Sequence, residues 1–163
     1  MWIHDESEKI VVYGTIEQIF AIVTTAKYWP LWNVSTESVR GAIEAPIQLG
    51  DIIHEQINVF RSFGDIIHEQ EETDWEVTEL YPPRRVVLTK RGAWLNGLTI
   101  TYHLRQRDEV VDFTRELEIN STEIVNLTQE DIRSLCRLFL DASFFELRRL
   151  AERIYGNHYF RTD

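Results

Sequence analysis

The heptapeptide GDIIHEQ occurs twice in this chain, starting at Gly50 and again at Gly64. Each copy contains a histidine next to a glutamate, and the four side chains are His54, Glu55, His68 and Glu69. Imidazole and carboxylate groups are common zinc ligands, and carboxylates also act as general acids and bases. The repeat therefore raises three possibilities: a metal site, a catalytic site, or only two neighbouring strands.

The alternation of a β-strand argues against a metal site in the repeat. Adjacent residues of a strand point to opposite faces, so His54 and Glu55 cannot both reach one ion. The intervening RSFG suits a three-residue hairpin loop with Gly64 in the left-handed conformation. This loop predicts that Glu55 lies opposite Glu71. His54 then lies opposite Glu72 on the solvated face, offset from the second histidine, so we expect no metal ligands and no cofactor.

The glutamates of the repeat are better candidates for chemistry than the histidines. The predicted inner face of the hairpin includes Trp75 and Val77, and it also carries Glu55 and Glu69. A carboxylate in a partly dry cavity gains proton affinity, as a general acid or base requires. Arg115 shares the apolar stripe of the strand VVDFTRELEI, where an unpaired charge would be costly. The candidate catalytic residues are therefore Glu55, Glu69 and Arg115; the alternatives are an internal salt bridge or side chains that reach water.

Aromatic and small side chains at core positions could line a ligand cavity, although most such residues only pack. Pro30 limits Trp29 to extended or turn geometry, and the tryptophans on either side of it are candidates for a cavity mouth. No nucleophile elbow, phosphate loop or H-E-x-x-H motif is found in the sequence. The candidate ligand-binding residues are Trp29, Trp32, Trp75, Val77, Tyr102, Phe113, Phe139 and Ser143.

The composition indicates one acidic globular domain. Of 163 residues 44% are apolar, enough for a single domain over residues 1–163 with its core at about 9–155. The net charge of −10 opposes contact with phosphate backbones, so we expect no nucleic-acid partner. The single cysteine, Cys136, fits a reducing compartment. The opening MWIHDESEKI lacks a basic segment followed by a long apolar run, and we therefore expect a cytoplasmic protein without integral membrane association.

The elements that must position these residues can be read from periodicity. KIVVYG at 9–14 predicts a strand, and Thr15 with Gln18 forms a capping box for the helix TIEQIFAIV. Thr128 caps a run from Gln129 to Tyr155 that contains no glycine or proline, which predicts a long amphipathic helix. Between the helices we expect six strands, near 37–43, 51–60, 66–80, 85–91, 97–106 and 110–119.

This order of elements, together with TIEQIFAIV, YWPLW and WEVTELYPPRRVVL, resembles the START-related SRPBCC superfamily and, within it, the polyketide cyclase/dehydrase-like branch. The likeness extends from about Lys9 to Ile154. It implies an α+β helix-grip fold, in which a curved antiparallel sheet of about seven strands wraps a long C-terminal helix, with two short helices after the first strand. It also implies a cavity between sheet and helix that takes an apolar or amphipathic ligand.

Three functions remain open at this stage. The first is binding of a small hydrophobic or amphipathic molecule, such as a lipid, a polyketide or an isoprenoid-like compound. The second is a cyclase/dehydratase-like enzyme, in which Glu55 or Glu69 moves a proton next to a carbonyl and Arg115 stabilises the enolate. The third is an interaction module whose own side chains fill the cavity. Trp2 or the tail from Tyr155 to Phe160 could form a homodimer contact.

Overall fold

A computed structural model of the chain describes residues 2–7, 9–33, 36–57, 71–92, 96–120, 130 and 144–156. In chain order its elements are β1 (Trp2–Glu6), β2 (Ile10–Tyr13), α1 (Ile16–Thr24), a 3-10 turn (Ala26–Tyr28), α2 (Trp29–Trp32), β3 (Thr36–Gly41), β4 (Ile52–Ile57), β5 (Glu71–Tyr81), β6 (Arg85–Arg91), β7 (Thr99–Arg107), β8 (Val110–Asn120) and α4 (Phe144–Tyr155). The strands, the two early helices and the C-terminal helix follow the predicted order.

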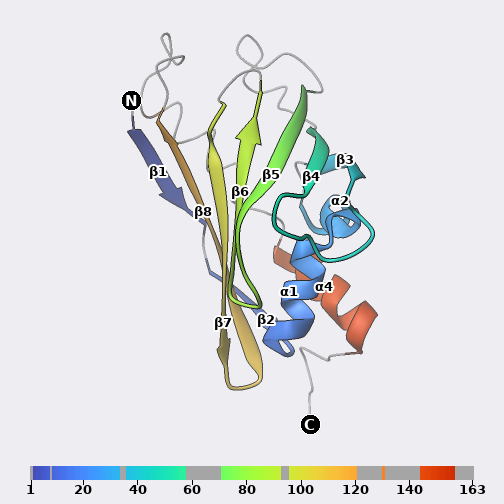
Figure 1. Ribbon diagram of the computed structural model, residues 1–163. Coiled ribbons are helices and arrows are strands. Elements are labelled where there is room, and N and C mark those ends of the chain that lie inside the picture. Colours follow the sequence, from blue (N-terminus) through green and yellow to red (C-terminus); the bar gives the residue numbers. More distant parts are fainter. Residues whose placement is uncertain are drawn as a thin grey trace.

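The strands of the described residues form one antiparallel sheet with the order β1-β8-β7-β6-β5-β4-β3, and β2 also pairs with β8. The sheet curves around the helices (Figure 1), and α4 contacts β2, α1 and α2. Between them lies an apolar core that includes Ile19 and Ile22 of α1 and Leu147 and Leu150 of α4. The α+β helix-grip architecture expected from the sequence is confirmed. No helix within the described ranges has the length and apolarity to cross a bilayer.

Helix α1 begins where the sequence predicts. The Thr15 side chain accepts a hydrogen bond from the Gln18 backbone at 3.2 Å, and the Gln18 side chain accepts one from the Thr15 backbone at 3.1 Å. These two bonds satisfy backbone donors that a helix start otherwise leaves unpaired. The apolar face of the helix, including Ile19, Phe20 and Val23, is buried toward the sheet.

An eighth strand, β1, was not expected from the sequence. It pairs with the far end of β8, with Trp2 opposite Asn120, while β2 pairs with the near end. The two strands are separated by a break at Ser7, whose backbone N–H donates to the Arg115 carbonyl at 2.8 Å. The Arg115 N–H in turn donates to the Ser7 hydroxyl, also at 2.8 Å. The sequence pattern does not predict this strand, because DESEK is rich in charged residues and a solvated edge strand lacks an apolar run.

The predicted hairpin register is wrong by two residues. Glu55 lies opposite Thr73 rather than Glu71, and His54 lies opposite Asp74 rather than Glu72. The turn geometry assumed for RSFG set the predicted register, and residues 58–70, which include His68 and Glu69, lie outside the described residues. A shift of two preserves the alternation of side chains, so the assignment of faces remains correct.

Trp29 departs from the predicted conformation. It has φ −53° and ψ −45°, which is helical, although Pro30 follows it. The proline lies in the first turn of α2, where a backbone N–H would have no intrahelical acceptor, so its absence costs no hydrogen bond. Trp29 and Trp32, the candidates for a cavity mouth, are only 2% and 1% exposed. The short helix instead turns both indoles into the core.

The C-terminal helix ends as predicted at Tyr155. Gly156 follows with φ +66°, and its N–H donates to the Glu152 carbonyl at 2.7 Å. Glycine adopts this left-handed conformation without the steric cost that other residues incur. Of the predicted helix 129–155, the structure describes residue 130 and residues 144–156, so positions 131–143, with Cys136, Phe139 and Ser143, lie outside the described residues.

An ion pair fastens the hairpin between β7 and β8. Arg107 donates from Nε and from a terminal nitrogen to the two Asp112 carboxylate oxygens, each at 3.1 Å, and Lys9 lies 3.9 Å from the same carboxylate. The Arg107 hydrogen bonds hold the pKa of Asp112 below its ordinary value. This ionised pair therefore stabilises the fold only where the carboxylate is charged.

We predict that Asp112→Asn lowers the free energy of unfolding by about 0.5–1 kcal/mol at neutral pH. Because the pKa of Asp112 is lower in the folded than in the unfolded chain, its contribution is complete above the unfolded value and disappears as the pH falls through the folded value. Urea unfolding of both proteins between pH 7 and pH 2.5 measures this difference. In an Arg107→Gln background the same substitution should cost much less; an unchanged cost would show that the pair is not responsible.

Candidate functional site

Glu55 is a buried carboxyl group on the inner face of β4. It is 6% exposed, although glutamate is among the residues least often buried. Its Oε2 accepts a hydrogen bond from the Thr36 hydroxyl at 2.5 Å, and its Oε1 accepts one from Trp75 Nε1 at 3.0 Å. Thr36 comes from the neighbouring strand β3 and Trp75 from β5, so strands on both sides of β4 hold this carboxyl group.

Arg115 occupies the inner face of β8 and is 1% exposed. Its guanidinium carbon lies 5.6 Å from the centre of the Trp32 ring, a distance at which a cation is attracted to the ring face. The two hydrogen bonds with Ser7 fix its backbone where the edge strand is interrupted. Strand alternation thus directs a permanent positive charge into the apolar interior, as predicted from VVDFTRELEI.

The two charged groups line the same cavity. It has a volume of about 20 Å³, which is room for about one water molecule, and its walls are Trp29, Asn33, Glu55, Trp75, Leu88, Ile100, Tyr102 and Arg115. The walls combine a carboxyl, a guanidinium, an amide and a phenol with aromatic and aliphatic surface. Such a mixture can orient the polar end of a small molecule while contacting its apolar part.

The electrostatics of the cavity favour a neutral Glu55 more than water does. Burial raises the pKa of Glu55, while the hydrogen bonds from Thr36 and Trp75 and the charge of Arg115 lower it, and the net shift is upward. Burial likewise raises the pKa of Tyr102 well above its ordinary value, so its hydroxyl keeps its proton. The site therefore contains one group that can gain or lose a proton, Glu55, and one fixed cation.

Three aromatic rings pack edge to face beside the cavity, and one of them, Tyr102, forms part of its wall. The ring centres of Tyr102 and Phe113 are 5.4 Å apart. The ring centre of Trp32 lies 6.2 Å from that of Tyr102 and 5.9 Å from that of Phe113. Such pairs contribute about 0.5–1.5 kcal/mol each beyond their buried area. The cluster gives the guanidinium of Arg115 a rigid aromatic surface to lie against.

Among the described residues, the buried polar atoms without a hydrogen-bond partner include Nε1 of Trp32 and the hydroxyl oxygen of Thr73, which lies opposite Glu55. A buried donor without a partner costs about 1–3 kcal/mol. The indole of Trp32 therefore keeps one donor available close to Arg115.

The structure brings together most of the described residues that the sequence singled out. Trp29, Trp75 and Tyr102 line the cavity with Glu55 and Arg115. Of the other candidates, Trp32 and Phe113 form the aromatic cluster, and Val77 is buried in the core without lining the cavity. Glu69, Phe139 and Ser143 lie outside the described residues.

Several residues of the site were not expected from the sequence. Thr36 supplies a hydrogen bond to Glu55, and the signal for it is weak, because a single threonine at the start of a strand is common. Leu88 and Ile100 face each other across β6 and β7 on the cavity wall. Alternation could have assigned Ile100 to the inner face, but all of Val86, Val87 and Leu88 are buried, which masks the period of two.

Solved structures share this fold. The Aha1 dimer from Colwellia psychrerythraea is 18% identical, with a TM-score of 0.59 over 92% of this chain and 94% of that chain. A conserved protein from Geobacillus kaustophilus is 13% identical, with a TM-score of 0.68 over 96% and 98% of the two chains. Ara h 8.0201 is 9% identical, with a TM-score of 0.63 over 94% and 99%. No protein-family model and no curated protein matches the chain.

At these identities the likeness establishes the fold alone, because one fold carries many functions. The fold that these structures share with this chain is the α+β helix grip expected from the sequence.

We predict that Glu55→Gln becomes more stable relative to the native protein as the pH rises. Because the pKa of Glu55 is raised by folding, its favourable contribution is complete below the unfolded value and is lost as the pH rises through the folded value. Glutamine cannot ionise and keeps an oxygen for Trp75. The difference amounts to about 1.4 kcal/mol for each unit by which the pKa is raised.

Urea unfolding of both proteins at pH 4, 6 and 8 measures this trend. The matched control is Glu44→Gln, since the Glu44 side chain is 80% exposed and pairs with Lys27 on the surface. Parallel stability curves for the native protein and Glu55→Gln would contradict the burial of an ionisable carboxyl group.

Proposed function

We propose that this protein binds a small amphipathic molecule between the inner face of its sheet and the C-terminal helix. The polar end lies against Glu55 and Arg115, and the apolar body, of lipid, polyketide or isoprenoid type, lies against the aromatic walls. The observation that carries the proposal is the convergence of a buried carboxyl group, Glu55, and a buried guanidinium, Arg115, on one cavity. The helix-grip fold and the apolar ligands that it implies support it.

The energetic cost of these groups favours binding over a purely structural role. Removing a carboxyl and a guanidinium from water costs several kcal/mol each, and apolar residues of similar size are often at least as stable in their place. A ligand that hydrogen-bonds to both groups replaces the hydrogen bonds that they lost on leaving water, and this makes its binding specific. Arginine is well suited to this task, because its planar fork can hold a carboxylate, phenolate or enolate through two parallel hydrogen bonds.

The size of the cavity sets a condition on binding. Typical ligand pockets have volumes of about 300–1,000 Å³, whereas the cavity between the described residues is about 20 Å³. A ligand larger than water therefore requires the walls to move. If they do not move, the cavity is filled by the protein's own side chains, and the chain is an interaction module.

We predict that Arg115→Met weakens binding of a medium-chain fatty acid by about tenfold or more, because a hydrogen bond to a charged group contributes about 1.5–3 kcal/mol. Binding of the matching fatty alcohol should change less. The affinity for each ligand is measured by thermal stabilisation and by tryptophan fluorescence, since Trp29 and Trp75 line the cavity. The control is Arg105→Met, an exposed position on β7.

The panel for this experiment includes fatty acids, aromatic polyketides and isoprenoids. No stabilisation by any class would contradict the ligand proposal and favour the interaction module. Equal losses for the acid and the alcohol would show that Arg115 acts through packing alone.

The raised pKa of Glu55 favours an enzyme as the second candidate. In a cyclase/dehydratase-like reaction, Glu55 would remove or return a proton at a carbon next to a carbonyl, and Arg115 would stabilise the enolate. We predict that Glu55→Gln keeps ligand binding but lowers turnover by at least about 100-fold. Equal turnover by the variant and the native protein would exclude Glu55 as the acid or base.

We further propose a dimer in the cytoplasm as the working state. The solved Aha1 protein from Colwellia psychrerythraea is described as a dimer, and the acidic composition and single cysteine suit a reducing compartment. Light scattering on the full chain measures the oligomeric state.

A further inference from the structure

The outer face of the sheet, opposite the cavity, carries a group of histidines and glutamates from three neighbouring strands. His4 and Glu6 come from β1, Glu116 and Glu118 from β8, and His103 from β7. In the β1–β8 register, His4 lies opposite Glu118 and Glu6 lies opposite Glu116. Cross-strand partners share a face, so this register places the four side chains of β1 and β8 together.

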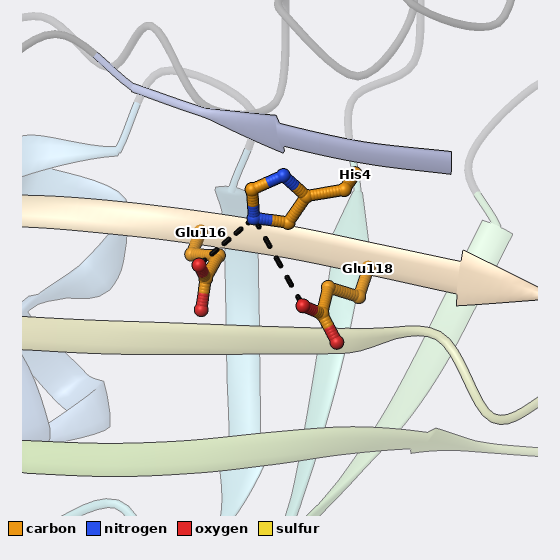
Figure 2. A group of neighbouring side chains, drawn as sticks. All are labelled: His4, Glu116 and Glu118. Atoms are coloured by element: carbon orange, nitrogen blue, oxygen red, sulfur yellow. Dashed lines mark hydrogen bonds and ion pairs between the residues drawn. The ribbon is translucent and has the colours of Figure 1, made fainter. Parts of the chain in front are cut away.

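The carboxylates of Glu116 and Glu118 point toward the imidazole of His4 (Figure 2). The Nε2 atom of His4 lies 2.8 Å from a Glu116 carboxylate oxygen and 3.9 Å from one oxygen each of Glu118 and Glu6. The other Glu116 oxygen lies 3.3 Å from Nε2 of His103. His4, Glu116 and Glu118 each offer one possible metal-ligand atom, and these three atoms lie within 4.8 Å of one another.

These separations suit a small divalent ion. Zinc bonds of about 2.0–2.2 Å in tetrahedral geometry place neighbouring donor atoms about 3.3–3.6 Å apart. The observed separations of 2.8 and 3.9 Å lie on either side of that range. Shifts of roughly 0.3–0.5 Å would bring both separations from His4 into that range. The glutamate and histidine side chains at this face are partly exposed, so an ion can enter from solvent.

The charge of this group also favours a cation. In the described residues, the positive groups that lower the pKa of Glu116 are His4 and His103, with no lysine or arginine among them. A second group, on the outer face of β4 and β5, consists of His54, Glu72 and Asp74. There Arg40 forms an ion pair with Glu72, so a positive charge already neutralises one carboxylate of this group.

We propose that His4, Glu116 and Glu118 form a binding site for a divalent transition-metal ion of the Zn²⁺ type. Glu6 or His103 supplies a fourth ligand. Mixed imidazole and carboxylate donors favour zinc over magnesium or calcium, which select oxygen ligands alone. The ion joins the edge strand β1 to β8, and the site is independent of the ligand cavity on the inner face.

The test is calorimetric titration of the untagged full chain with zinc chloride, with thermal unfolding of the same samples. We expect saturable binding of one ion and a rise in the unfolding temperature. His4→Gln and Glu118→Gln should each lower the affinity at least about tenfold, since even changes outside the direct ligands cost about 10–100-fold.

Two controls make the result decisive. His54→Gln removes the histidine of the second group and should leave zinc affinity unchanged, while circular dichroism shows that each variant is folded. Failure of the native protein to bind zinc saturably would overturn the site. Binding that survives both His4→Gln and Glu118→Gln, or that is lost only in His54→Gln, would also overturn it.

Discussion

The structure depends on how it accommodates a full positive charge inside its apolar core. Strand alternation leaves Arg115 no route to solvent, because Phe113 and Leu117 on the same face of β8 are also buried. The surroundings compensate in several ways: the ring of Trp32 faces the guanidinium, and Glu55 lies on the wall of the same cavity. A break in the edge strand brings Ser7 to the Arg115 backbone. The buried charge of Arg115, the aromatic packing around it and the break in the edge strand are therefore coupled to one another.

The two faces of β8 have separate roles that a single register maintains. Arg115 points inward, while its neighbour Glu116 points outward to His4 and His103. A slip of one residue would bury Glu116 and expose Arg115, which the electrostatics of either face oppose. β8 accordingly has the most extensive pairing of the sheet, with β1 and β2 along one side and β7 along the other.

Much of the fold follows from local patterns in the sequence. The capping box of Thr15 and Gln18, the terminator Gly156 and the alternation through Glu55 and Arg115 each depend on neighbouring residues, and each is found in the structure. The hairpin register was less predictable, because it depends on the geometry of one turn. β1 was missed, since its stability comes from a partner strand far along the chain. The group around His4 was missed for the same reason: residues distant in sequence carry no visible spacing.

The pairing of Ser7 with Arg115 has a consequence for the order of folding. These residues are 108 positions apart in the sequence, so the contact that closes the core edge has a high loop-closure cost. During synthesis the N-terminal segment emerges long before β8 exists, and it must wait while β3 to β7 are made. The segment that contains β1 is thus synthesised well before its partner strand and is among the last to gain it. Until then, the inner surface that receives Arg115 remains incomplete.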